Sequence, residues 1–194
     1  MIRHLFLAMI SSILLSAVSS AQMMHKHHQA AVVQRAIAVL DPTKGSSVHG
    51  VVTFETVEKG VHVVANVSGL KPGKHGFHVH EFGDCSSDSS LAAGGHFNPG
   101  GMRHGAPDSE MRHAGDMGNL TADDSGNAHL DYIDPMISLQ GDHSIVGHGV
   151  IVHEKEDDLA TQPTGNSGAR IGCGVIAMAV ATEPVGASGS SGAP

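Results

Sequence analysis

The chain has 194 residues, of which 40% are hydrophobic, and its formal net charge is −8. This length is ample for one domain with a buried core. The acidic balance argues against a nucleic-acid partner, which requires a basic surface, and it repels small anions at long range unless the protein provides a local positive focus.

The first 21 residues have the features of a signal peptide. Arg3 supplies a short positive region, residues 5–18 are largely apolar, and Ser19, Ser20 and Ala21 are small enough for a cleavage site. We expect cleavage after Ala21, which places the mature protein in the periplasm or outside the cell, away from the membrane. The alternative, a retained anchor helix, is disfavoured because the apolar stretch is too short to span a bilayer.

Residues 22–30 form a short arm rich in histidine, with His25, His27 and His28. A flexible imidazole cluster can bind copper or zinc, so the arm either captures metal or is an incidental solvated tail. Both interpretations stay open at this point.

Seven stretches have the composition of β-strands, rich in Val, Ile, Thr and Phe with partial alternation. They are residues 32–40, 48–57, 61–67, 76–82, 128–133, 149–153 and 173–181. No stretch has a sustained helical period, although residues 154–160 could form one or two helical turns. This pattern predicts one all-β domain over residues 31–183, folded as a sandwich or Greek-key barrel, and a disordered Gly/Ser-rich tail at 184–194.

Two long polar segments interrupt the strands, at residues 83–118 and 154–169. Irregular segments of this length inside a small domain are typically functional or disordered. The first carries three histidines and Asp116, so a bound metal would offset the entropy lost when this loop becomes ordered.

Histidine spacing predicts a metal site. His78 and His80 point to the same side of a strand, because alternate side chains share a face, and paired imidazoles suit copper or zinc. The loop from His96 to Asp116 supplies enough ligands for a tetrahedral zinc site. Together with His153, six histidines and one aspartate could hold two metals if one imidazole serves both.

The chain has two cysteines, Cys85 and Cys173. In an exported protein we expect them to form a disulfide, which would close a loop of nearly half the chain and stabilise the fold by about 4–5 kcal/mol. Free buried thiols or additional metal ligands are the disfavoured alternatives.

Five short segments together resemble the Cu,Zn superoxide dismutase family, and the similarity runs from about residue 36 to residue 180. The segments are 76–84 (GFHVHEFGD), 94–99 (GGHFNP), 112–119 (RHAGDMGN), 141–155 (GDHSIVGHGVIVHEK) and 165–174 (GNSGARIGCG). A lone His-x-His would be weak evidence, whereas this ordered set is specific.

The resemblance implies an eight-stranded, immunoglobulin-like Greek-key barrel or sandwich with two long functional loops. It also implies one copper and one zinc per chain, held on either side of a shared imidazole. The implied copper ligands are His78, His80, His96 and His153, and the implied zinc ligands are His96, His104, His113 and Asp116.

The activity that the resemblance implies converts two superoxide anions and two protons to dioxygen and hydrogen peroxide, while copper cycles between Cu(II) and Cu(I). His96 would release copper, take up a proton and give it to the second superoxide. Arg170 would position superoxide, since a guanidinium is permanently charged and presents directed donors. Asp157 matches the carboxylate that hydrogen-bonds His78 on copper and His104 on zinc, although it could also be an ordinary helix-start charge.

The chain departs from cytosolic eukaryotic members in two places. Cys85 directly follows Asp84, as in exported bacterial members, which alters the loop that eukaryotic members use for dimer contacts; a homodimer and a monomer both stay open. Residues 158–164 lack the Lys and Glu residues that guide superoxide in many relatives. Guidance is therefore expected to rest on Arg170, with Lys155 as a candidate helper.

Two other functions compete with the dismutase. A copper-delivery module without turnover is disfavoured because the copper ligands and Arg170 are all present. A mutase with copper alone is disfavoured because the zinc ligands are intact. Of the other histidines, His75 is expected either to brace the copper-binding strand or to be merely structural, and a structural or surface role is expected for His49, His62, His129, His143 and His148.

Overall fold

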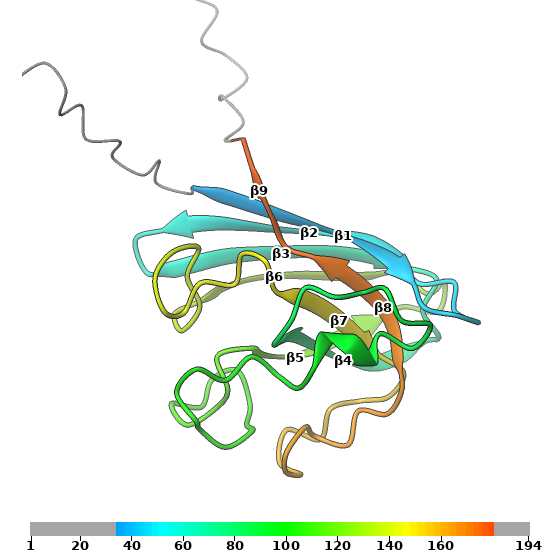
Figure 1. The fold of residues 1–194 in the computed structure, drawn as a ribbon. Helices are drawn as coiled ribbons and strands as arrows, with labels where there is room; N and C mark the ends of the chain where they lie inside the picture. Colours follow the sequence, from blue (N-terminus) through cyan, green and yellow to red (C-terminus); the bar gives the residue numbers. More distant parts are fainter. Residues whose placement is uncertain (1–33, 181–194) are drawn as a thin grey trace, which may run out of the picture. The chain divides into compact units, whose positions relative to one another are not determined.

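Nine β-strands form the framework of residues 34–180, the part of the chain that this computed structural model describes (Figure 1). The strands are β1 (Arg35–Pro42), β2 (His49–Val57), β3 (Gly60–Ser68), β4 (Gly73–His80), β5 (Asp116–Ala122), β6 (Ala128–Asp134), β7 (Gly149–His153), β8 (Arg170–Val175) and β9 (Ala177–Ala179). The predicted signal peptide, the histidine-rich arm and the C-terminal tail lie outside the described residues.

The strands form a closed antiparallel barrel. Their order is β2-β3-β6-β5-β4-β7-β8-β1, and the pairing of β1 with β2 closes the ring. The jump from β3 to β6 and from β4 to β7 makes the connectivity a Greek key. The predicted eight-stranded Greek-key barrel is therefore confirmed, with β9 as an additional short strand that pairs with β1.

Alternation of apolar and polar residues explains the strands that sequence predicted best. In β3, the side chains of Val61, Val63, Ala65 and Val67 are buried while their neighbours are more exposed. Side chains of one parity therefore pack into the barrel, as the period of two requires. They join a single large apolar core with residues from the other strands.

Strand β5 was not predicted, because its sequence lacks the expected alternation. Asp116 and Asn119 interrupt the apolar pattern, and Gly118 has a positive φ of 77°. The first long loop therefore ends at the start of β5, about three residues earlier than predicted. Burial on both faces of β5 comes from the loops that cover it, which a strand pattern does not reveal.

Residues 154–160 do not form the one or two helical turns that their sequence allows. Leu159 has a positive φ of 61°, and the side chain of Asp158 accepts hydrogen bonds from the backbone N–H groups of Ala160 and Thr161. Such local bonds from an aspartate compete with helix formation. Within residues 34–180, no helix is long and apolar enough to cross a membrane.

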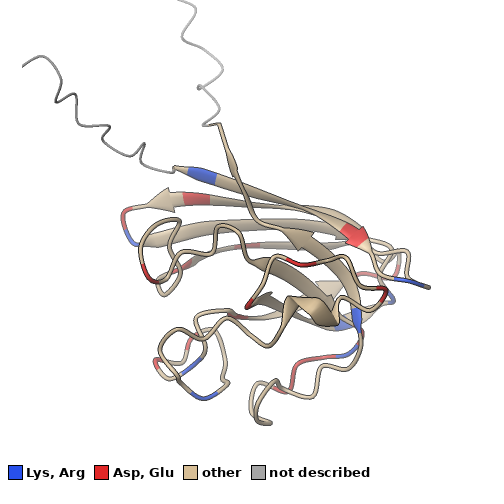
Figure 2. Ribbon diagram, in the orientation of Figure 1, with Lys and Arg blue, Asp and Glu red and all other residues tan. Residues whose placement is uncertain are grey.

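The connections 81–115 and 154–169 are long loops, as predicted, and Figure 1 shows them extending from the β4, β7 and β8 region. A short 3-10 helix, Leu91–Ala93, lies in the first loop. Acidic and basic residues are mixed along the loops and strand ends of the described chain (Figure 2).

Candidate metal centre

The two histidines of β4 lie on the outer surface of the barrel, yet both are buried. Phe77 and Val79 point into the core, so His78 and His80 point the other way. Their exposed fractions are 0% and 1%, because the two long loops cover this face of the strand. The sequence pattern thus places paired imidazoles in a site that is shielded from bulk water.

Backbone pairing brings the remaining site residues to β4 and β7. His96 forms an isolated antiparallel bridge with His80. Asp116, at the start of β5, pairs with His78 after a bulge. On the other side, the last residue of β7, His153, pairs with the first residue of β8, Arg170. The sheet itself therefore assembles the site.

Two groups of potential ligands result, and they share His96. In each group, the four potential ligand atoms lie within 4.8 Å of one another. The first group is His78, His80, His96 and His153, and the second is His96, His104, His113 and Asp116. These are the two sets that the sequence predicted, and all their members are buried.

Four ring nitrogens in these groups are buried without a hydrogen-bond partner: His78 Nδ1, His96 Nε2, His104 Nδ1 and His113 Nδ1. Buried polar atoms in proteins are nearly always satisfied, so a cluster of exceptions requires an explanation. Their chemistry fits metal ions. A group of four imidazoles suits copper, and three imidazoles with one carboxylate suit zinc.

The two oxygen atoms of the Asp116 carboxylate make different contacts. Oδ2 accepts hydrogen bonds from the backbone N–H groups of Gly105 and His113, which fix its orientation. Oδ1 faces the second histidine group, 2.7 Å from Nδ1 of His96, 3.0 Å from Nδ1 of His104 and 3.3 Å from Nδ1 of His113. One carboxylate oxygen and three imidazole nitrogens thus converge on one point.

Most of the imidazoles are oriented through their other ring nitrogen. Nδ1 of His80 donates to the carbonyl oxygen of Gly94 at 3.0 Å, and Nδ1 of His153 donates to that of Gly168 at 3.3 Å. Carbonyl oxygens only accept, so these contacts fix the tautomer and leave each Nε2 free as a ligand. The two Nε2 atoms face each other at 3.3 Å.

Asp157 links the two groups. Its Oδ2 accepts from Nε2 of His78 at 2.7 Å, and its Oδ1 accepts from Nε2 of His104 at 2.9 Å. The side chain of Asn119, on β5, holds the backbone of Asp157 at both its N–H and its carbonyl group. The contacts predicted for Asp157 are therefore present, and they orient one imidazole in each group.

Burial favours the neutral form of the first group. Desolvation lowers the pKa of His78, even though Asp157 opposes the shift, and it lowers the pKa of His80 and His153 well below the ordinary value. Desolvation also lowers the pKa of His96 to about 4. Neutral imidazole is the form that binds a metal.

In the second group, one histidine, His104, favours the protonated form instead. Burial alone would lower the pKa of His104, but the two adjacent carboxylates, Asp157 at its Nε2 and Asp116 facing its Nδ1, outweigh burial and raise the pKa to about 9. Although burial opposes ionisation of both carboxyl groups, their histidine neighbours hold their pKa values well below the usual range. The two ionised carboxylates therefore favour a positive charge between them, at His104.

Arg170 lies beside the first group in a small open cavity of about 320 Å³. Its Nη1 donates to the carbonyl oxygen of Ser90 and its Nη2 to that of Gly94, both at 2.5 Å. Partial burial lowers the pKa of the guanidinium, which still leaves it charged at neutral pH. The cavity is lined by His80, Ser89, Leu91, His96, His153, Thr164, Gly168, Ala169 and Arg170.

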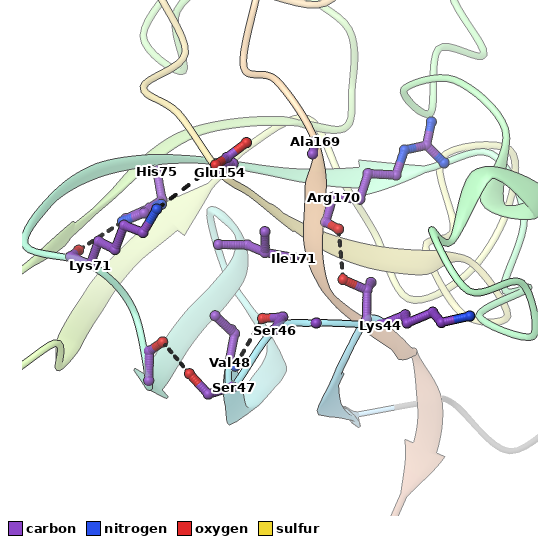
Figure 3. A pocket seen from close by; sticks show the side chains of 13 residues that line it. Lys44, Ser46, Ser47, Val48, Lys71, His75, Glu154, Ala169, Arg170 and Ile171 are labelled. Carbon is purple, nitrogen blue, oxygen red and sulfur yellow. Dashed lines mark hydrogen bonds and ion pairs between the residues drawn. The ribbon is translucent and has the colours of Figure 1, made fainter.

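A second cavity of about 320 Å³ lies along the other side of β8, the strand that begins with Arg170 (Figure 3). Figure 3 shows the side chain of Arg170 pointing away from Lys71, His75 and Glu154. Its backbone carbonyl oxygen accepts a hydrogen bond from Thr43. The ring of His75 contacts the carbonyl oxygens of Lys71 and His153, so His75 connects the backbone at the end of β7 to the connection before β4.

The disulfide between Cys85 and Cys173 is present, with a Cα–Cα distance of 5.8 Å. It joins the loop that contains Ser90 and Gly94 to the strand that begins with Arg170. The two segments that hold Arg170 are therefore tied together covalently. Lys155, the candidate helper, is exposed on the second loop.

Several residues that shape the site were not singled out from sequence. Arg112 is completely buried and donates to the carbonyl oxygens of His113, Ala114 and Asp116, which fixes the loop before β5. It also pairs with Asp134 at 2.7 Å. Backbone carbonyl acceptors such as Gly94 carry no sequence signal, and the 112–119 segment that begins with Arg112 does not indicate that this side chain is buried.

A closed Greek-key barrel with two adjoining histidine groups defines a β-barrel metalloprotein with a two-metal site. A model of the copper/zinc superoxide dismutase family matches residues 48–176. The chain is 44% identical over 143 residues to superoxide dismutase [Cu-Zn] 5 of Dictyostelium discoideum, covering 70% of this chain and 93% of that protein. This chain therefore belongs to the copper/zinc superoxide dismutase family.

The chain also resembles a solved structure. A crystal structure of the clock protein EA4 is similar, with a TM-score of 0.73 and 43% sequence identity. The alignment covers 79% of this chain and 99% of that one. Nearly the whole length of each of these two relatives is thus represented here.

Proposed function

We propose that the chain is a superoxide dismutase, which converts two superoxide anions and two protons to dioxygen and hydrogen peroxide. The observation that carries this function is the position of His96, whose single ring belongs to both ligand groups. Bound copper supplies the one-electron redox chemistry of this reaction, and bound zinc has no redox chemistry and fixes the adjoining loop.

The residues are assigned by the atoms that face each group. His78 uses Nδ1, whereas His80 and His153 use Nε2, and these atoms suit copper. His104 and His113 use Nδ1 and Asp116 uses Oδ1 for zinc. His96 offers Nε2 to the copper side and Nδ1 to the zinc side, which makes it the shared ligand.

Arg170 binds the substrate in this proposal. Its guanidinium is held by the carbonyl oxygens of Ser90 and Gly94, and its remaining N–H donors are available to a small anion in the cavity that His80, His96 and His153 also line. A fixed cation at the cavity wall supplies the local positive focus that an acidic protein needs.

His96 is also placed to handle a proton. Its Nε2 atom lies on the copper side and has no hydrogen-bond partner, and the residue lines the cavity that also contains Arg170. In this proposal, a proton held at Nε2 is donated to a basic oxygen of the product.

Metal analysis combined with a superoxide assay tests the function. We expect about one copper and one zinc per chain, and dismutation that is lost when both are removed and restored when both are returned. Stoichiometric metal without dismutation would favour the copper-delivery alternative. In His96→Ala, spectra of copper and of cobalt in the zinc site that match those of the wild type would contradict the shared ligand.

Export is a further part of the proposal. It is supported by the Cys85–Cys173 disulfide, which suits an oxidising compartment, and by the signal-like sequence of the first 21 residues. Mass spectrometry of the protein secreted by its host should find a mature chain that begins at Gln22. Recovery of the intact chain from the cytosol with both cysteines reduced would refute export.

A further inference from the structure

The side chain of Gln162, in the second long loop, makes hydrogen bonds to both backbone polar groups of His104. Its Oε1 accepts from the N–H of His104 at 2.9 Å, and its Nε2 donates to the carbonyl oxygen of the same residue at 2.9 Å. A third bond runs from Nε2 to the carbonyl oxygen of Ala160 at 3.1 Å. The carboxamide is thus bound at both ends, although Gln162 is an exposed residue.

These contacts have only one workable orientation. If the carboxamide were flipped, its NH2 group would face the N–H of His104 and its oxygen would face a carbonyl oxygen, so both contacts would be repulsive. Because the amide oxygen and nitrogen match the N–H and C=O of one residue, the pair is geometrically specific. A side chain that only filled space would not need this match.

The turn that carries Gln162 is itself held in place. Asp158 accepts hydrogen bonds from the backbone N–H and the hydroxyl group of Thr161, and the N–H of Gly165 donates to the carbonyl oxygen of Thr161. Within the same turn, the N–H of Asp158 donates to the carbonyl oxygen of Gly165. Gln162 is therefore presented to His104 from a closed loop rather than from a free chain.

His104 is held from two directions by this one loop. Asp157 accepts from the ring at Nε2, and Gln162 holds the backbone on either side of the Cα atom. The same arrangement recurs one step further on, where the carboxamide of Asn119 holds both backbone polar groups of Asp157. Asn119, Asp157, His104 and Gln162 thus form a continuous chain of contacts that spans both loops.

We infer that Gln162 is a positioning residue for the zinc ligand His104: its carboxamide holds the His104 backbone so that Nδ1 points at the zinc position. This inference rests on the proposed zinc site. The short segment 158–164 lacks the charged residues that guide superoxide in many relatives. In this inference it instead supports a zinc ligand.

Zinc release from the full chain tests the inference. Protein loaded with Zn²⁺ is mixed with an excess of chelator, and the release rate is followed with a zinc indicator. We expect Gln162→Ala to release zinc about 10-fold faster, the lower end of the range for residues that support metal ligands. Gln162→Glu, of the same size, keeps an acceptor for the His104 N–H but loses the donor, and should release zinc at least as fast as Gln162→Ala.

The matched control is Gln140→Ala, at another exposed glutamine, which should release zinc at the wild-type rate. A second measurement uses Co²⁺ in place of zinc, because its visible absorption reports the symmetry of the ligands. A changed cobalt spectrum in both Gln162 variants, with an unchanged one in the control, supports the inference.

Wild-type release rates and cobalt spectra in Gln162→Ala would overturn the inference while leaving the zinc site intact. Equal acceleration in Gln140→Ala would overturn it too, because the effect would then be unspecific. If the wild type itself gives no tetrahedral cobalt spectrum, the proposed zinc site is wrong and the positioning role falls with it.

Discussion

Arg170 is the backbone pairing partner of His153 across β7 and β8, at a bulge where the two strands diverge. The proposed substrate-binding side chain therefore starts from a backbone position in register with a copper-side histidine, beside the hydrogen bond from the N–H of Glu154 to the carbonyl oxygen of Ala169. Two carbonyl oxygens in the first loop then hold its guanidinium. The position of the charge is set by the sheet and by the loop together.

Replacing this charge should reduce catalysis without changing metal content. We expect Arg170→Ala to lower kcat/KM about 10- to 100-fold, as for the loss of one charge-assisted contact worth about 1.5–3 kcal/mol. Stopped-flow kinetics at several ionic strengths should also show a weaker salt dependence. Lys59→Ala, which removes an exposed charge from the β2–β3 turn, is the control; equal losses in both variants would assign the effect to net charge.

Gly165 should tolerate no side chain. Its φ is +67°, and an added Cβ atom would lie 1.7 Å from Oδ1 of Asp157 and 2.6 Å from Nε2 of His104. Gly165→Ala should therefore displace the carboxylate that orients both imidazoles and weaken zinc binding by about 10-fold or more, measured by chelator competition. Gly100→Ala, where the new atom meets only the flexible side chain of Met102, should bind zinc normally. Normal binding by both variants would show that Asp157 is dispensable.

Tyr132 provides a pH-dependent prediction with its own optical signal, because the chain has one tyrosine and no tryptophan. Burial and the nearby Asp134 raise its pKa well above 10. The fold therefore favours the neutral phenol, so its contribution to stability is complete below pH 10 and declines as the pH rises above that value. Absorbance at the phenolate band should show ionisation at a higher pH in native protein than in urea.

The corresponding variant is Tyr132→Phe, which should remove this part of the decline in the free energy of unfolding above pH 10. Identical ionisation midpoints for the native and the urea-unfolded protein would show that the phenol is not protected by the fold.

Asp134 is expected to be critical for stability. Its carboxylate pairs with the fully buried Arg112 at 2.7 Å and also accepts from the N–H of Met136. Asp134→Ala leaves an uncompensated buried charge, which typically costs about 3–5 kcal/mol. Urea unfolding followed by circular dichroism should show this loss, whereas Asp124→Ala, at an exposed aspartate, should lie within about 0.5 kcal/mol of the wild type. A small effect at Asp134 would mean that the carbonyl contacts of Arg112 are sufficient.

Sequence predicted the parts of this molecule that depend on local pattern. Alternating apolar residues identified strands such as β3, and the histidine motifs identified both ligand groups. Strand β5 was missed because Asp116 and Asn119 break its alternation, although Asp116 is buried and Asn119 is half-buried.

The remaining parts depend on contacts between distant segments. Gln162 meets His104 across 58 residues, and Ser90 and Gly94 contribute only their carbonyl groups to Arg170. Such contacts are fixed by how two loops fold against each other, so no local pattern reveals them. A backbone acceptor is available at every residue, and its use depends on geometry alone.

The disulfide has a consequence for proteolysis. It joins residues 88 positions apart, so the segment from Cys85 to Cys173 is a covalent ring. Most of the proposed ligands, as well as Arg170, lie on this ring, and His78 and His80 lie just before it on β4. A single peptide-bond cut in either long loop inside the ring would leave one covalent molecule, with its hydrogen-bonded strands still joined. A nicked chain should therefore keep its mass, apart from one added water, until the disulfide is reduced, and separate into two fragments only then under denaturing conditions.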